Sequence, residues 1–119
     1  MKIADVEGYY RAALRSPDSF VFVAEVDGHI AGTIRADIQD IPKFFKHNKI
    51  LYIDDVCVAP EYRKAGVAKA LLLEVEALAK KRKIRRLQAR VYAFNTPAQK
   101  LFEKAGYRAP HATWDKLLK

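Results

Sequence analysis

The residues most capable of chemistry in this sequence form a basic turn that leads into a predicted helix. Arg63 and Lys64 precede Gly66, and Lys69 follows it within one helical turn. The first N–H groups of a helix have no partner inside the helix, and the helix dipole adds partial positive charge there. Gly66 lets a ligand approach the backbone, because it has no Cβ. The turn therefore predicts a binding site for phosphate or pyrophosphate.

This turn matches neither of the two common glycine-rich phosphate loops. It lacks the pattern G-x-x-x-x-G-K-S/T, and its single glycine does not fit the dinucleotide fingerprint G-x-G-x-x-G. A surface turn that is basic without binding anything is the alternative, because the whole chain is rich in Lys and Arg.

Two predicted elements would position this turn. Residues 50–58 are rich in β-branched and aromatic side chains, which favours a strand. From Gly66 to about Arg82, apolar residues recur at helical spacing, namely Val67, Leu71, Val75 and Leu78. The strand would thus deliver the chain to the N-terminus of a helix.

The chain is predicted to form one α+β domain over residues 1–119, without linkers or repeats. The expected elements are a helix over 4–15, hairpin strands over 20–26 and 29–38, a loop over 39–49, the strand 50–58, the main helix, a strand over 87–92, a helix over 97–105 and a last strand over 113–118. This order predicts a mixed sheet with helices packed on it.

Two ordered motifs resemble the GNAT superfamily of N-acetyltransferases. The family's coenzyme motif, R/Q-x-x-G-x-G/A, stands here at residues 63–68, and residues 95–107 match N-x-x-A-x-x-(apolar)-Y-E-K-x-G-(aromatic). The resemblance covers residues 51–107 and extends back to residue 20. It implies a three-layer α/β/α fold with a central mixed, mostly antiparallel sheet, shortened at the N-terminus. It also implies transfer of an acetyl group from acetyl-coenzyme A to a primary amine of a small molecule or protein.

The resemblance also implies where acetyl-coenzyme A binds. In the family, the strands that match 50–58 and 87–92 splay apart, often at a β-bulge, and pantetheine enters the gap. The residues expected to bind the coenzyme are Val56, Cys57 and Val58 at pantetheine, Arg63, Lys64, Ala65, Gly66, Val67, Ala68 and Lys69 at the pyrophosphate, and Asn95 and Phe102 on the second side. For Cys57 the alternative is a small core residue.

Acetyl transfer needs a neutral amine, so a base must remove a proton. Asp54 and Asp55 are adjacent in the predicted strand 50–58, and the period of two should send them to opposite faces. The segment resembles spermidine/spermine acetyltransferases, which carry an acidic residue at the position of Asp54. We expect Asp54 to be the base, with Asp55 as the second choice. A carboxylate that merely pairs with a nearby Lys or Arg is the alternative.

Two departures from the family pattern affect the expected chemistry. Phe102 stands where the family commonly has a tyrosine that protonates the leaving thiolate. Tyr92, at the end of the neighbouring strand, is the candidate substitute, and a packed strand aromatic is its alternative. Only 19 residues precede Phe20, so the acceptor site is either open or completed by a second subunit. A homodimer is therefore expected, with Phe44, Phe45 and residues 114–118 as candidate contacts.

The composition favours a cytoplasmic protein. No apolar run reaches the ~18 residues that a membrane span needs, and the N-terminus has no apolar signal-peptide core. A single cysteine suits a reducing compartment. His29, His47 and His111 are scattered, and no Cys/His cluster has metal spacing. We therefore expect no membrane partner and no metal.

The basic character of the chain leaves two rival functions open. The net charge is +8, and six of the seven residues 80–86 are Lys or Arg. This run is either a solvated helix end or a contact for nucleic acid or the 3′-phosphate of coenzyme A. A small nucleic-acid-binding module would use the charge but would not explain the paired motifs. A coenzyme A-binding sensor or scaffold with weak activity would explain Phe102.

Overall fold

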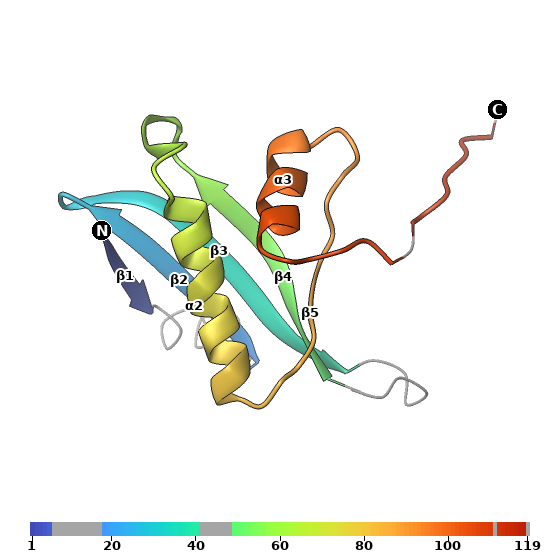
Figure 1. Ribbon diagram of the computed structural model, residues 1–119, viewed down its shortest axis with the longest axis horizontal. Helices are drawn as coiled ribbons and strands as arrows, with labels where there is room; N and C mark the ends of the chain where they lie inside the picture. The colour runs from blue at the N-terminus through green and yellow to red at the C-terminus, as the bar shows by residue number, and fades with distance from the viewer. Residues whose placement is uncertain (6–17, 41–48, 111, 119) are drawn as a thin grey trace.

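A computed structural model of the chain describes residues 1–5, 18–40, 49–110 and 112–118. Its centre is one five-stranded sheet with the strand order β1-β2-β3-β4-β5 (Figure 1). The elements are β1 (Lys2–Asp5), β2 (Ser19–Val26), β3 (His29–Asp40), β4 (Lys49–Val58), the 3-10 helix η1 (Pro60–Tyr62), α2 (Val67–Lys81), β5 (Leu87–Ala89) and α3 (Thr96–Lys104). Strands β1 to β4 pair antiparallel and β5 pairs parallel to β4, so the expected mixed sheet is confirmed.

The β2–β3 hairpin forms where the sequence predicts it. Val26 pairs with His29, and the two residues between them, Asp27 and Gly28, have φ values of 50° and 79°. Two consecutive positive φ values are the requirement of the tight hairpin turn that Asp-Gly favours. This hairpin supplies β3, the strand on which β4 is registered.

Helix α2 crosses one face of the sheet (Figure 1). Its apolar stripe packs against alternate residues of β2, β3 and β4, and the buried cluster contains Phe20, Phe22, Ala24, Ile34, Ala36, Leu51, Ile53, Val67, Leu71, Leu72, Val75 and Ala79. Phe102 from α3 joins the same cluster, so both described helices share one core. Removal of this apolar surface from water is the main force that holds α2 against the sheet.

The N-terminal part of the chain differs from the sequence prediction. Ala4 and Asp5 belong to β1, not to a helix, because Lys2–Asp5 pairs with the exposed edge of β2. Sheet pairing here overrides a weak helical pattern. The rest of the expected helix, residues 6–17, lies outside the described residues. So do residues 41–48 of the expected loop, with Phe44, Phe45 and His47.

Of the two strands predicted in the C-terminal half, one is shorter than expected and the other is absent. The strand expected over 87–92 ends at Ala89. The strand expected over 113–118 is absent. Residues 112–118 have no regular structure, and all of them are exposed. Figure 1 shows this segment extending away from the body of the molecule. Its large apolar residues, Trp114, Leu117 and Leu118, do not alternate with a period of two, so they cannot line one face of a strand.

Within the residues that the structure describes, no helix is long and apolar enough to cross a membrane.

Candidate functional site

The anion site predicted at residues 63–69 is an uncapped helix N-terminus. Helix α2 begins after Gly66, which has a left-handed φ of 79°; no side chain caps the helix, and its first turn holds no acidic residue. A Cβ at Gly66 would meet no heavy atom within 4 Å, so the space beside it is open. Arg63, Lys64 and Lys69 are exposed around it. Free N–H groups, the helix dipole and three cations together suit a phosphate or pyrophosphate.

The other predicted members of this turn can contribute only backbone groups. Ala65 is exposed and Ala68 half-buried, whereas Val67 is buried in the core. The turn that precedes them is shaped by η1, in which Tyr62 N donates to Ala59 O at 2.9 Å. This short helix ends β4 and redirects the chain into α2, as the sequence around Pro60 predicts.

Strands β4 and β5 separate after three paired residues. Leu51–Ile53 pairs with Leu87–Ala89, and beyond this point β4 continues to Val58 paired with β3 alone. Residues 54–58 therefore have an open edge on the side of β5, as far as the described chain shows. A gap between these two strands is what the family resemblance implies.

A β-bulge lies where the two strands separate. Asp55 pairs with Arg35 and Ile53 with Ala36, so Asp54 is an extra residue in β4. Ile53 and Val56 both pack in the core, which leaves two residues instead of one between inward positions. The prediction that Asp54 and Asp55 point to opposite faces is therefore wrong. Asp55 is on the face of its partner Arg35, because cross-strand partners share a face. Asp54 lies on that face too, since its Oδ2 is 3.6 Å from Arg35 Nε, and both carboxylates are exposed.

The bulge also determines which backbone donors face the open edge. Leu51 N donates to Arg86 O on the β5 side, at 2.9 Å, and Ala59 N donates to Ala31 O on the β3 side, at 2.8 Å. N–H groups alternate in direction along a strand, so those of Val56 and Val58 point to the open edge. An oxygen in the gap can accept a hydrogen bond from either. Cys57, between them, is exposed rather than a buried core residue.

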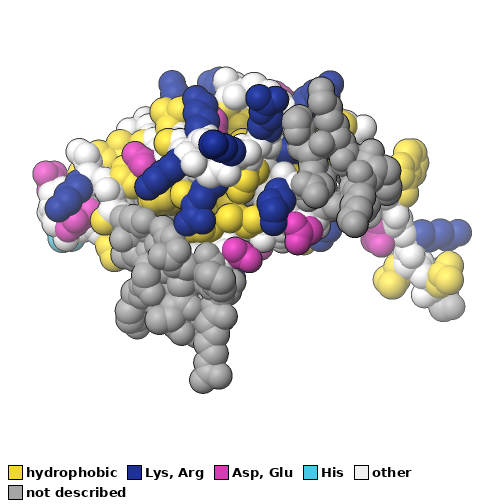
Figure 2. Space-filling model, turned by 90° about the horizontal axis from the view of Figure 1, so that it is seen from below, with side chains coloured by type: hydrophobic (Ala, Val, Ile, Leu, Met, Phe, Trp, Pro, Cys, Tyr) yellow, Lys and Arg dark blue, Asp and Glu magenta, His cyan; other side chains and the backbone are white. Residues whose placement is uncertain are grey.

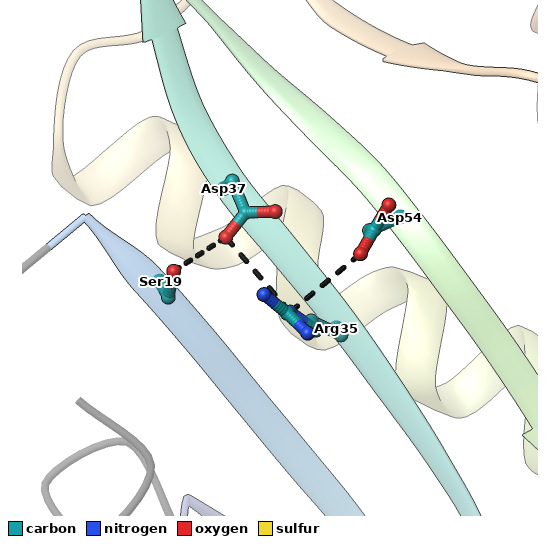
Figure 3. A network of polar contacts seen from close by, with 4 residues as sticks. All are labelled: Ser19, Arg35, Asp37 and Asp54. Carbon is teal, nitrogen blue, oxygen red and sulfur yellow. Dashed lines mark hydrogen bonds and ion pairs between the residues drawn. The ribbon is translucent and has the colours of Figure 1, made fainter. Parts of the chain in front are cut away.

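Asp54 belongs to a polar network on the sheet face turned away from α2 (Figure 3). Arg35 Nε lies 3.6 Å from Asp54 Oδ2 and 4.0 Å from Asp37 Oδ1. Ser19 Oγ donates to Asp37 Oδ1 at 2.5 Å. The alternative of a carboxylate paired with a basic residue is thus observed, yet Asp54 remains 45% exposed and open to a ligand. Sequence reasoning missed Arg35; its signal was Arg-x-Asp on one strand, which places both side chains on one face.

The α3 residues that were expected at the coenzyme have structural roles in the protein. Asn95 caps α3, and its Oδ1 accepts from Ala98 N at 3.3 Å. Phe102 is 9% exposed and lies in the core. The partly buried Val56 and Val58 pack on that same core, so Phe102 and the open edge of β4 are linked by packing.

Two tyrosines near α3 differ in environment. Tyr92 is 62% exposed and stacks on Phe94, with ring centroids 5.4 Å apart, so the alternative of a packed strand aromatic is wrong. Tyr107 lies edge-on to Phe102, with centroids 5.1 Å apart, and its buried hydroxyl has no hydrogen-bond partner among the described residues. Burial, and then the charge of Glu76, raises the pKa of Tyr107 well above its usual range, so the hydroxyl stays protonated.

The basic run 80–86 lies at the far end of α2 from Gly66. Figure 2, seen from the lower end of α2 in Figure 1, shows Lys and Arg side chains gathered on this surface. The 15 residues of α2 place its ends about 22 Å apart at 1.5 Å per residue, so the run adds nothing to an anion held at Gly66. The Arg82 guanidinium lies 5.1 Å from the centroid of the Phe20 ring, which gives that cation a packing role.

Comparisons with known proteins identify the family of this chain. Residues 3–107 match the model of the acetyltransferase (GNAT) family. A Bacillus subtilis protein provisionally named a ribosomal protein bS18-alanine N-acetyltransferase is 30% identical over 105 residues, which are 84% of this chain and 61% of that protein. An N-alpha-acetyltransferase of Sulfurisphaera tokodaii is 26% identical over 103 residues, 80% of this chain and 60% of that protein. The chain thus spans about three-fifths of the length of these two relatives.

A solved structure shares the fold. An aminoglycoside N-acetyltransferase in complex with coenzyme A superposes with a TM-score of 0.80 at 20% identity, and the match covers 99% of both chains. The expected GNAT fold is therefore confirmed. Because the family model spans most of the sequence and the mixed sheet matches, this chain belongs to the acetyltransferase (GNAT) family.

Proposed function

We propose that this protein transfers an acetyl group from acetyl-coenzyme A to a primary amine of a small molecule or protein. One observation carries the proposal: the uncapped N-terminus of α2 follows a strand, β4, whose open edge begins at a bulge that holds a carboxylate. The names of the two relatives and the coenzyme A bound to the solved neighbour support it.

In this proposal, acetyl-coenzyme A is held by the turn and by the open edge. The N–H groups at the start of α2, with Arg63, Lys64 and Lys69, bind the pyrophosphate. The N–H groups of Val56 and Val58 lie beside the gap between β4 and β5, where the pantetheine arm would run. Asn95 and Phe102 support the far side through α3. The coenzyme would thus bind from the side of α2, and the amine from the side of Asp54.

Acetyl transfer would take place where the coenzyme, bound from the side of α2, meets the amine, bound from the side of Asp54. Asp54 accepts a proton from the amine, whose nitrogen then attacks the thioester carbonyl. A C–N bond forms, and the oxyanion of the tetrahedral intermediate accepts a hydrogen bond from a strand N–H such as that of Val56. The C–S bond then breaks and coenzyme A leaves as its thiolate, and the extra proton on the new amide nitrogen passes to that thiolate or to solvent. Asp55, exposed on the same face, is the second candidate for the base.

The leaving thiolate does not require a strong acid. An ordinary thiol has a pKa of about 8.5, so the thiolate is a tolerable leaving group near neutral pH. Phe102 cannot donate a proton, and Tyr92 is the candidate donor with an exposed hydroxyl. Transfer is therefore proposed to proceed without a tyrosine at position 102, and Tyr92→Phe tests whether Tyr92 donates the proton instead.

The acceptor amine is best sought among three classes. The relatives' names indicate a protein α-amine, the solved neighbour indicates an aminoglycoside, and the segment around Asp54 resembles polyamine acetyltransferases. The test is an amine panel that holds an alanine-starting peptide, an aminoglycoside and spermidine, with release of free coenzyme A thiol as the readout. Thiol release that depends on one amine supports the proposal. Binding of coenzyme A without release from any amine contradicts it.

A coenzyme A sensor or scaffold is the second candidate function. It is favoured by Phe102, which is buried in the core and brings no hydroxyl to the site. It predicts coenzyme A binding by calorimetry and only weak transfer. A small nucleic-acid-binding module is the third, and it predicts RNA binding that weakens steeply with salt.

A homodimer in the cytoplasm completes the proposal. The exposed Trp114, Leu117 and Leu118 offer apolar surface for a second copy. Light scattering at micromolar concentration tests this, and a mass equal to one chain contradicts it. The cytoplasmic location depends on the sequence features alone.

A further inference from the structure

We propose that Arg35 is a positioning residue that holds the Asp54 carboxylate at the opening between β4 and β5. This inference rests on the proposed acetyl transfer, with Asp54 as its base. It adds a residue that acts through Asp54 and does not itself touch the amine or the coenzyme.

Asp54 needs a positioning group because of its place in the strand. It is the extra residue of the bulge and has no register partner on β3. Its side chain is 45% exposed, and Arg35 is its one polar partner among the residues that the structure describes. An exposed carboxylate without a cross-strand neighbour would otherwise rotate freely, and a general base must stay within hydrogen-bond reach of the proton it removes.

Arg35 is in turn held from the opposite side. Asp37 lies two residues along β3 and so faces the same way, with its Oδ1 4.0 Å from Arg35 Nε. Ser19 on β2 is buried and donates to that same Asp37 oxygen at 2.5 Å. The contacts run from a buried hydroxyl on β2, through β3, to the exposed carboxylate on β4 (Figure 3). One end of the network is therefore fixed by the sheet.

Stability alone does not explain this network. The contacts of Arg35 Nε at 3.6 and 4.0 Å are too long to be hydrogen bonds, and its N–H is buried without an acceptor in the described part of the chain. Exposed ion pairs contribute little to stability, and a buried donor without an acceptor is unfavourable. The arrangement places a permanent charge beside Asp54 at a cost in hydrogen bonding, which is typical of a functional site.

The test compares Arg35→Met, which keeps length and removes charge, with Lys49→Met as the matched control. Lys49 pairs with Asp40 at 3.1 Å between the same two strands but far along them from the bulge. With an amine found active in the panel, Arg35→Met should lower kcat by about 10- to 100-fold, the scale expected for a misplaced catalytic group. KM for acetyl-coenzyme A should not change, Arg35→Lys should recover part of the loss, and Lys49→Met should have no effect.

A double-mutant cycle decides whether Arg35 acts through Asp54. In an Asp54→Asn background, the further change Arg35→Met should have no added effect on kcat. If the two losses instead multiply, Arg35 acts independently and the proposal is overturned.

A readout without turnover separates this proposal from the proposed function. Crystal structures of the unmodified protein and of Arg35→Met should show Asp54 in one rotamer in the first and in several in the second. A single unchanged rotamer in both overturns the positioning role even if transfer is found. If no amine of the panel is acetylated while Asp54 loses its order in Arg35→Met, the transferase assignment fails and the positioning role stands.

Discussion

Gly32 on β3 lies directly against Val67, the first residue of α2. A Cβ at Gly32 would stand 3.0 Å from Val67 Cγ1 and 2.8 Å from the carbonyl oxygen of Cys57. No other residue would leave room for this contact. The close approach sets the distance between the N-terminus of α2 and the end of β4, so one missing methyl group places the proposed anion site relative to the open edge of β4.

Replacing Gly32 by Ala should therefore weaken both the fold and the anion site. The added methyl group must displace backbone, and we expect a loss of about 1–3 kcal/mol in the free energy of unfolding, as for overpacked cores. Coenzyme A affinity should fall as well. Gly28→Ala is the control, since a Cβ there meets nothing within 4 Å; it should cost stability through its positive φ but leave coenzyme A affinity unchanged. Thermal unfolding and calorimetry measure the two effects.

Gly66→Asp should abolish coenzyme A binding, because it puts a negative charge where the pyrophosphate is expected and forces a side chain on a left-handed residue. Arg63→Ala should weaken binding by ~1–3 kcal/mol, the range for charge-assisted hydrogen bonds. Gly106→Asp is the matched control, since Gly106 also has a positive φ, of 91°, and follows α3. Equal affinity in Gly66→Asp and the parent, measured by calorimetry, would refute the assignment of the site.

Asp54→Asn should lower kcat/KM by ~10²–10⁴-fold, the usual span for loss of a general base. Coenzyme A affinity should stay the same, because the residue faces away from α2. Asp55→Asn, one position along the strand and also exposed, should have a much smaller effect. A large effect of Asp55→Asn together with a small effect of Asp54→Asn would reassign the base.

Tyr107→Phe should stabilise the protein slightly or leave it unchanged, because it removes a buried hydroxyl without a partner. Its pH dependence is more specific. Burial raises the pKa of Tyr107 in the folded protein above the unfolded value of 10.0. Above about pH 10 the unfolded chain therefore releases a proton that the folded chain keeps, and the stability of the parent falls as the pH rises.

Tyr107→Phe should lose less stability than the parent between pH 9 and pH 11, the interval around the ordinary tyrosine pKa of about 10. Denaturant unfolding across this interval is the measurement. Parallel curves for the two proteins would show that the hydroxyl is solvated in solution.

The local elements could be predicted from the sequence because their signals are local. The Asp27-Gly28 turn fixes the hairpin, and the apolar stripe from Val67 predicts α2 to within about one residue. The uncapped start of α2 after Gly66, where the anion site is proposed, lies in the same short segment. These features depend on neighbours within a few residues, and so they needed no knowledge of the sheet.

The features that were missed depend on pairing between distant strands. The bulge at Asp54 is visible only as a shift in register against β3, so a strict period of two gave the wrong face for one carboxylate. Arg35 and Asp54 are 19 positions apart, and no local pattern joins them. β1 forms by pairing with the edge of β2, and β5 ends at Ala89, where its pairing with β4 also ends. Each of these is a tertiary effect.

In the part of the chain that the structure describes, residues 54–58 of β4 have no strand partner on the side of β5. A row of unpaired strand amides is a template for any other extended chain, and so it favours aggregation. If acetyl-coenzyme A accepts hydrogen bonds from these amides, it takes the place of a neighbouring strand, and its binding then contributes to the stability of the fold. The fraction of protein that stays free of aggregates and resistant to protease should then rise with the acetyl-coenzyme A concentration, because binding to the folded state alone draws the population toward it. The cellular supply of the acetyl donor would in this way set the abundance of the protein as well as its turnover.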